Sequence, residues 1–516
     1  MLGVVDHLHP SATVEVPLDV ARHRDQIGFP AEQRRPPPAR RDEIGAGHHG
    51  EGAGHGHAVL RRQGRPARRP FHPPVPVQPA PDTDGHAAPA GCRARTSRHD
   101  VRVTPEPPAG PDRLARRLGP VDATVVGLGA MLGAGVFVVF APAAAAAGGA
   151  LLIAVLLAGL VGACNALSSA RLAALYPESG GTYVYGRERL GPFWGYLAGG
   201  AFVVGKTASC AAMAMTIGSY LLPEGARWTA AAAVVLVTAL NCWGVHRGAA
   251  VTAVVVVLVI AVLVAVVIAA LSSGTSVGAP LVTTGATPTG VLTAAGFLFF
   301  AFAGYARIAT LGEEVRDPAR TIPRAIRAAL AVTVLMYLAL AAALLIVLGP
   351  AATAASTSPV ADLAAAGGGW LRWPVRIAAV LAAGGALLAL VLGVSRTVLA
   401  LARDGRLPRG LAAVSSTDRT PVRAELAVGA VVLGLVLTVD LRAAIGFSAV
   451  TVLTYYLIAN AAASTLPGSP TSKTIPVLGA AGCVLLAGSL PLGSLLPGLA
   501  VLAVIAGSWW LPEART

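Results

Sequence analysis

Two glycine-rich stretches decide the fold of this chain: GLGAMLGAGVF at residues 127–137 and GFLFFAFAGYARIATLGEEV at residues 296–315. Both belong to apolar runs, yet glycines interrupt them. An interior glycine costs a helix about 1 kcal/mol, so the four glycines of the first stretch weaken its helix by roughly 4 kcal/mol. Taken alone, this stretch fits two structures. Gly129 and Gly133 form a small-residue face that packs on another helix, or the helix breaks at a polar substrate.

The position of the second stretch favours the broken helix. It carries Gly296, Gly304 and Gly312 and lies five apolar spans after the first stretch. Two interrupted spans at matching positions of two halves are typical of inverted-repeat transporters. The N-terminus of a half-helix offers unpaired amides and partial positive charge to a carboxylate, and the carbonyls of an unwound turn suit an ammonium group. The pattern therefore predicts a site for both ends of a small zwitterion.

The composition excludes several other classes of protein. The 516 residues are 54% hydrophobic and only 13% charged, and the mean hydropathy is +0.65, whereas soluble domains carry about 25% charged residues. The formal net charge of +14 therefore does not indicate a nucleic-acid partner. The five cysteines are scattered and predict neither a disulfide framework nor a zinc site. We expect a membrane protein without a metal or a cofactor.

Twelve apolar stretches resemble membrane spans, for which about 20 residues are needed. They cover approximately residues 121–142, 147–170, 193–221, 229–244, 249–271, 291–311, 325–348, 371–401, 424–439, 443–466, 475–490 and 494–511. With the N-terminus inside, the inner segments hold 18 lysines and arginines and the outer ones hold four: Arg227, Arg372, Arg376 and Arg442. This asymmetry follows the positive-inside rule. It predicts a multi-pass protein of the cytoplasmic membrane with both termini in the cytoplasm.

Residues 1–110 differ from the rest of the chain. They hold ten of the eleven histidines and no long apolar run, so they cannot bury enough apolar surface to offset chain entropy. We expect a disordered tail without a signal peptide. Its cluster of His48, His49, His55 and His57 resembles a metal-binding tract, although compositional bias is the simpler interpretation. A further hypothesis is that the tail is not translated and that the coding sequence starts downstream of Met1. It would require a non-methionine start codon, because no methionine lies between Met1 and Met131.

Four motifs occur in the order in which one family carries them. Residues 127–137 resemble the first-helix motif of the amino acid–polyamine–organocation (APC) superfamily, and residues 299–326 resemble its sixth helix and the following loop. Residues 167–199 are similar to its second helix, first cytoplasmic loop and third helix, and SRTVLALARDGRLP at 395–408 is similar to the end of its eighth helix. The resemblance covers about 115–465 and is specific to the family, though not to a substrate.

This resemblance implies an all-α fold in which two inverted repeats of five helices, at 111–271 and 291–466, form a core beside two peripheral helices at 475–511. The substrate would lie at the broken first and sixth helices, with its carboxylate at the amides around Gly133–Gly135 and its amino group at nearby carbonyls. Phe300 lies where family members often place a gating aromatic, with packing of the FLFF run as the alternative. The candidate substrate-binding residues are Met131, Leu132, Gly133, Ala134, Gly135, Phe300, Ala301, Ala303 and Gly304.

The chain departs from the family pattern at two positions. Ala134 stands where serine is frequent, which removes a hydroxyl donor and leaves backbone amides. Ala306 stands where many relatives carry an acidic or polar residue.

Charged residues inside predicted spans are candidates for coupling or gating, because a charge at a helix centre costs about 2.5–3.5 kcal/mol on insertion scales. Lys206 in span 3 is a candidate coupling amine, with structural pairing to carbonyls or an acid as the alternative. Proton-coupled relatives carry such an amine in the fifth helix, but span 5 here has no ionisable residue. Arg307 lines the substrate path or closes an ion pair with Glu313 or Glu314.

Three further residues complete these predictions. Tyr305 and Glu178 belong to the candidate coupling or gating set, with a solvent-exposed loop acid as the alternative for Glu178. The resemblance suggests a structural role for Arg396 at the inner end of span 8. The loop at 176–191 suits a short interfacial helix, whereas Pro318 and Pro323 are expected to keep the loop at 313–326 from being helical.

The predicted function is secondary transport of amino acids or related amines by alternating access, with the proton as the expected coupling ion. The expected partners are a small-molecule substrate and the lipid bilayer. Exchange or export without ion coupling is the alternative. A membrane enzyme would need a convergent catalytic set, yet His246 is the one histidine after the tail. A channel would need pore-lining rings, and the nucleotide-binding pattern GxxxxGK[ST] is absent.

Overall fold

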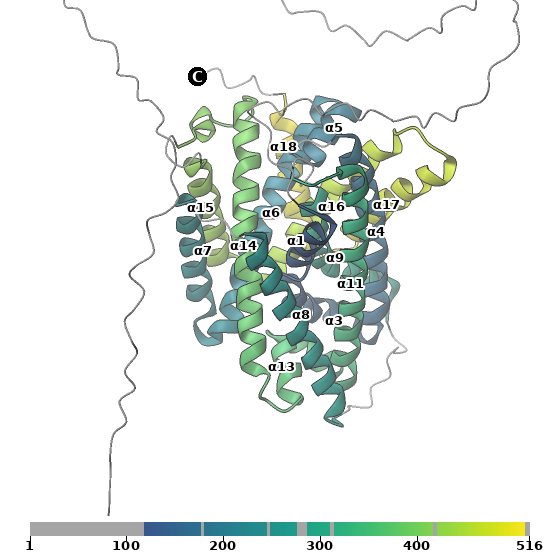
Figure 1. The fold of residues 1–516 in the computed structure, drawn as a ribbon, viewed down its shortest axis with the longest axis vertical. Coiled ribbons are helices and arrows are strands. Elements are labelled where there is room, and N and C mark those ends of the chain that lie inside the picture. The colour runs from purple at the N-terminus through teal and green to yellow at the C-terminus, as the bar shows by residue number, and fades with distance from the viewer. Residues whose placement is uncertain are drawn as a thin grey trace, which may run out of the picture. The chain divides into compact units, whose positions relative to one another are not determined.

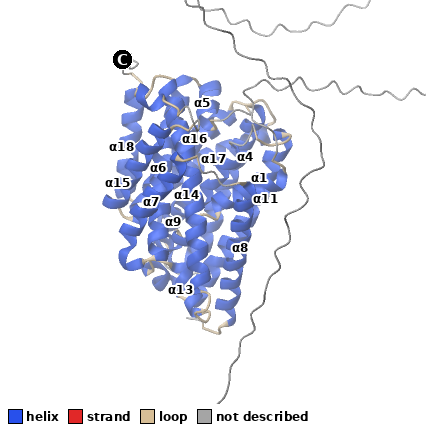
Figure 2. Ribbon diagram, turned by 60° about the vertical axis from the view of Figure 1, so that its left-hand side comes forward, coloured by secondary structure: helices blue, strands red, loops and turns tan. Residues whose placement is uncertain are grey.

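The computed structural model describes residues 118–176, 180–244, 248–275, 286–309, 314–415 and 420–510. Within these ranges every regular element is helical, apart from one isolated bridge between Leu118 and Val315 (Figure 2). This confirms the predicted all-α, polytopic fold. The predicted tail at 1–110, with its histidine cluster, lies outside the described residues, as do Glu178 and Glu313.

Each of the twelve predicted stretches falls on helices. In chain order the longer ones are α1 (Pro120–Met131), α4 (Leu151–Leu175), α6 (Pro192–Leu221), α7 (Ala226–Cys242), α8 (Ala249–Ser272), α9 (Pro288–Phe302), α11 (Pro318–Val347), α14 (Arg372–Arg403), α15 (Val422–Thr438), α16 (Leu441–Ser464), α17 (Pro470–Gly488) and α18 (Leu492–Ser508). Shorter α-helices lie between them: α2 (Gly135–Val138), α3 (Phe140–Ala147), α5 (Thr182–Leu190), α10 (Ala306–Ala309), α12 (Gly349–Ala355) and α13 (Pro359–Ala366). The short interfacial helix predicted at 176–191 is confirmed as α5.

In the described part of the chain, nine helical segments are long and apolar enough to cross a membrane. A tenth candidate is the pair Ser472–Gly488 and Leu492–Ser508, which is bent by 118°. The remaining predicted span, α15, has 17 residues. The total of twelve spans therefore stays a prediction.

Prolines mark where many of these helices begin. Pro120, Pro192, Pro288 and Pro470 each lie in the first turn of a helix, where the missing N–H would have had no intrahelical partner. The expectation that proline keeps 313–326 from being helical is wrong from Pro318 onwards. That residue starts α11 at such a position, and the helix continues through Pro323.

The two interrupted segments pack on different helices of the bundle. α6 packs on α14 and α16, α11 packs on α4 and α1, and α9 packs on α4 (Figure 1). α8 turns large apolar side chains outward: Val254 is 69% exposed and Val257 is 65% exposed. Such a surface suits lipid rather than water.

A short backbone contact joins the chain before α1 to the segment that follows α10. Leu118 N donates to Glu314 O over 3.0 Å, and Arg316 N donates to Leu118 O over 2.9 Å. These bonds form the one isolated bridge of the described residues. They hold the chain just before the first interrupted segment beside the chain that follows the second.

Candidate functional site

The first predicted break lies between α1 and α2. Helix α1 ends at Met131 and α2 begins at Gly135, so Leu132, Gly133 and Ala134 are not helical. Met131, Leu132 and Ala134 are at most 1% exposed. Among the described residues, the amides of Gly133, Ala134 and Gly135 donate no hydrogen bond. Since buried amides normally have an acceptor, these three are available to an anionic group.

The second interruption is milder than the first. Helix α9 ends at Phe302, a 3-10 turn covers Ala303–Tyr305 (η3), and α10 covers Ala306–Ala309. The segment therefore tightens at Gly304 rather than unwinding fully. A 3-10 turn inside an α-helical segment leaves carbonyls without their usual partners four residues on, and it lies where the sequence predicted a break.

Close backbone approach brings the two breaks together. A Cβ at Gly304 would lie 2.4 Å from the carbonyl oxygen of Ala130 and 2.7 Å from Met131 N. A Cβ at Gly135 would lie 2.6 Å from the Cβ of Ala301. Only glycine fits at these two positions. The candidate substrate-binding residues of the first and second interruptions are therefore neighbours.

Both interpretations of the glycines in the first stretch find support. Gly129 lies in α1, before the break, and faces Thr252 and Val256 of α8, each 3.2 Å from where a Cβ would be. Gly133 faces Ala386 of α14 at 2.9 Å. Gly133 thus lies in the break and also lets α14 come close.

Sequence reasoning missed three tyrosines whose hydroxyls donate to carbonyls of the interrupted segments. Tyr337 of α11 donates to Met131 O over 2.6 Å and lies 3.5 Å from Ala301 O. Tyr456 of α16 donates to Ala303 O over 3.2 Å, and Tyr220 of α6 donates to Phe137 O over 2.7 Å. The signal was present, because a tyrosine within an apolar span needs a partner for its hydroxyl. The sequence does not reveal which partner that is.

Phe300 differs from the two aromatic residues next to it on α9, Phe299 and Phe302. The ring of Phe299 packs edge-on against Tyr456, with centroids 5.8 Å apart, and Phe302 packs against Tyr337 at 4.9 Å. Phe300 has no ring partner among the described residues and is 9% exposed, while both neighbours are fully buried. Its gating role stays a prediction.

The charged candidates occupy different places. Lys206 on α6 is 8% exposed, and in the described part of the chain its ammonium has neither a hydrogen-bond partner nor a carboxylate within 4.0 Å. Arg307 lies on α10, within electrostatic range of Glu314 and Arg396. Tyr305, two residues before Arg307, is fully buried, and the centroid of its ring lies 5.0 Å from that of Tyr456.

One buried acid was also missed. Glu425 on α15 is fully buried, and its Oε1 accepts a hydrogen bond of 2.6 Å from Ser395 Oγ of α14. It acts electrostatically on Cys210, one turn of α6 beyond Lys206, and Lys206 acts on the same thiol. The only acid of its predicted span was a usable signal, because intramembrane carboxylates are rare.

At the end of the bundle where α5 lies, aromatic and charged side chains connect three segments. The hydroxyl of Tyr183 on α5 donates to Asp404, which follows α14. Burial and this carboxylate raise the pKa of Tyr183 to about 12. The guanidinium of Arg406 lies 3.8 Å from the ring centroid of Trp509, after α18. These contacts tie α5 and the end of α14 to the end of α18.

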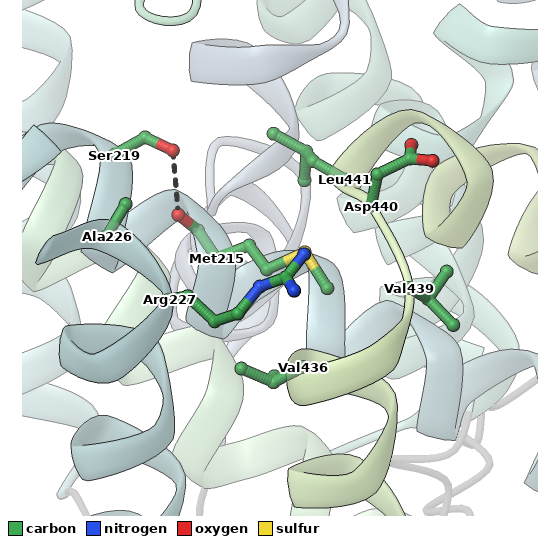
Figure 3. A pocket seen from close by; sticks show the side chains of 8 residues that line it. All are labelled: Met215, Ser219, Ala226, Arg227, Val436, Val439, Asp440 and Leu441. Carbon is green, nitrogen blue, oxygen red and sulfur yellow. Dashed lines mark hydrogen bonds between the residues drawn. The ribbon is translucent and has the colours of Figure 1, made fainter. Parts of the chain in front are cut away.

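A cavity of about 200 Å³ lies away from the breaks. Met215 and Ser219 of α6 line it together with residues of α7, α15 and the start of α16, including Arg227 and Asp440 (Figure 3). Arg227 donates to Leu437 O over 3.1 Å, and Asp440 caps α16 through Ala443 N at 2.8 Å. Both charged side chains thus hold helix ends in place.

Comparison with known proteins agrees with this architecture. The family model described as "Amino acid permease" matches residues 118–488, which include both interrupted segments. The chain belongs to the amino acid permease family. The expected membership of the APC superfamily is thereby confirmed, and this permease is a multi-pass membrane transporter.

Individual relatives differ in how closely they resemble the permease. An uncharacterized transporter of Mycobacterium tuberculosis is 57% identical over 399 residues, which are 76% of this chain and 90% of that protein. The vacuolar cationic amino acid transporter 4 of Arabidopsis thaliana is 28% identical over 64% of this chain and 60% of its own length. The branched-chain amino acid permease BcaP of Bacillus subtilis is 26% identical over 61% of this chain and 72% of its own length. The names of these relatives indicate transport rather than catalysis.

Proposed function

We propose that this permease moves amino acids or related amines across the cytoplasmic membrane by alternating access, coupled to protons. One observation supports a zwitterionic substrate above all others. Three amides without acceptors among the described residues, those of Gly133, Ala134 and Gly135, lie next to the second interruption. Fixed amides at the start of a half-helix stabilise a carboxylate.

The amino group of the substrate would bind on the other side of the same site. Its acceptors are the carbonyls of Met131, Ala301 and Ala303, which already face tyrosine hydroxyls. A carbonyl oxygen has two lone pairs and accepts a second hydrogen bond. Peptide groups that belong to two interrupted segments would thus bind both ends of one small molecule, with Phe300 beside them as the candidate gate.

Lys206 is the proposed coupling group. Lys206 is almost completely buried, with no carboxylate within 4.0 Å among the described residues. Burial disfavours a charged ammonium group relative to the neutral amine, so the residue is suited to binding and releasing a proton. The core of two inverted repeats, at 111–271 and 291–466, would supply the two conformations that expose the site to either side. The N- and C-termini would both lie in the cytoplasm.

The test is transport by the purified permease in proteoliposomes. Labelled amino acids, with leucine and arginine among them, are offered with and without an imposed pH gradient. We expect uptake that the gradient accelerates in the wild type, but not in Lys206→Ala or in Lys206→Arg, because a guanidinium keeps its proton. Equal uptake with and without the gradient would reject proton coupling. Transport that occurs only against internal amino acid would identify an exchanger instead.

A further inference from the structure

The carbonyls at both interruptions have hydrogen-bond donors that belong to the protein itself. Tyr337 is fully buried, and its hydroxyl donates to Met131 O over 2.6 Å while lying 3.5 Å from Ala301 O. Tyr456 is 1% exposed and donates to Ala303 O over 3.2 Å. Each break therefore has a tyrosine at the carbonyls that an ammonium group would bind.

The two tyrosines come from outside the interrupted segments and are held firmly. The ring of Tyr337 lies between Phe140 and Phe302, with centroid separations of 6.0 and 4.9 Å. One turn earlier on α11, Thr333 Oγ1 lies 3.8 Å from the sulfur of Met131. Helix α11 thus contacts both the carbonyl oxygen and the side chain of Met131, the last residue of α1.

The energetic consequence concerns the return of the carrier without substrate. Alternating access requires a closed form in which both breaks are buried. Without internal donors, closing around an unloaded site would leave buried acceptors unsatisfied, which is costly. A substrate ammonium would remove that cost only in the loaded form. A carrier of that kind would close readily when loaded and poorly when unloaded, and would therefore exchange substrates.

From this we infer that Tyr337 and Tyr456 act as built-in substitutes for the substrate's ammonium and allow the unloaded permease to return, so that it carries out net transport rather than obligatory exchange. This inference rests on the proposed function. Both tyrosines are positioning residues that act through the carbonyls of Met131 and Ala303. Removing one hydroxyl selectively penalises the unloaded closed form.

The experiment compares two modes of transport in proteoliposomes under the same imposed pH gradient. Net uptake is measured into vesicles without internal amino acid. Exchange is measured into vesicles that contain the unlabelled form of the same amino acid. The probe is labelled leucine or labelled arginine, whichever the wild type transports faster. The measured quantity is the ratio of the net rate to the exchange rate.

Tyr337→Phe is expected to lower this ratio about tenfold, the effect of one buried acceptor left without a donor, while exchange stays within about twofold of the wild type. Tyr456→Phe is expected to act in the same direction and serves if the first variant fails to fold. The matched control is Tyr220→Phe. It also removes a buried hydroxyl from a backbone carbonyl, Phe137 O at 2.7 Å, but this carbonyl lies beyond the break, so the ratio should not change.

Several results would overturn the inference. A wild type that transports only by exchange would do so, as would Tyr337→Phe and Tyr456→Phe variants whose net and exchange rates fall in parallel. A ratio of net to exchange rate that stays unchanged in both variants would also overturn the inference. A wild type that is inactive in both modes toward every amino acid offered would instead reject the proposed function, and this inference with it.

Discussion

The contact between the two interruptions predicts a severe effect of the smallest possible side chain at Gly304. In Gly304→Ala the new Cβ would lie 2.4 Å from both the carbonyl carbon and the carbonyl oxygen of Ala130, and 2.7 Å from Met131 N. Ordinary contacts of a Cβ begin at 3.4 Å. The two segments must therefore move apart by about 1 Å, and backbone atoms cannot rotate away as a flexible side chain would.

The size of the effect follows from the cost of overpacking, which is typically about 1–3 kcal/mol. If this cost falls on the form in which the two breaks are packed together, the population of that form decreases by about 5- to 150-fold. We expect initial uptake of labelled leucine or arginine to fall at least fivefold in proteoliposomes of matched protein content. The melting temperature in detergent should also decrease.

Gly393→Ala on α14 is the matched control, because a Cβ at Gly393 has no neighbour within 4 Å. The same change of residue in a helix without a close contact should leave uptake within twofold of the wild type, since alanine favours the helix. Uptake by Gly304→Ala equal to that of Gly393→Ala would show that the two segments are not in contact and would refute this reasoning.

Three further predictions concern other contacts of the described residues. Gly135→Ala should also lower uptake, and Ala301→Gly should restore only part of it, because the new Cβ lies 2.6 Å from the Cβ of Ala301, which glycine removes, and 2.7 Å from its Cα, which stays; additive effects in the double variant would contradict this coupling. Glu425→Ala should lower the melting temperature more than Glu425→Gln, because only glutamine keeps an acceptor for Ser395 Oγ; equal melting of the two variants would show that the bond contributes nothing. The pKa of Tyr183, raised to about 12, implies stabilisation that is complete below the ordinary value near 10 and lost as the pH rises towards 12. The difference in melting temperature between the wild type and Tyr183→Phe should therefore shrink above about pH 10, and a difference that grows there would have the wrong sign.

The sequence predicted the helical architecture and the place of both interruptions, because glycine periodicity and apolar length are local properties. It did not predict how strongly each segment is interrupted. Leu132–Ala134 leaves the helix altogether, whereas Ala303–Tyr305 only tightens to a 3-10 turn. That difference depends on neighbours, since Gly304 packs on the backbone of α1, and packing across about 170 positions leaves no local pattern.

The missed residues share one physical cause. Tyr337, Tyr456 and Glu425 lie in predominantly apolar spans, and their roles depend on which helix packs beside them. The error at Pro323 has a different origin. Proline was expected to end a helix, but near the N-terminus of α11 it removes few intrahelical bonds. Position within an element decided the outcome there, rather than residue type.

A binding site built from peptide groups, as proposed above, limits which amino acids the permease can distinguish. In the proposed site, the amides at 133–135 and the carbonyls of Met131 and Ala303 would recognise groups that all amino acids share. At Ala134 and Ala306 the chain carries methyl groups, both nearly buried, so these positions supply volume rather than hydrogen bonds. A hydroxyl or carboxylate there would select polar side chains of the substrate, because an unpaired buried group strongly disfavours a mismatched ligand. Under this proposal, selection among amino acids would come from the shape around Phe300 and from Arg307, the charged side chain closest in sequence to the second interruption.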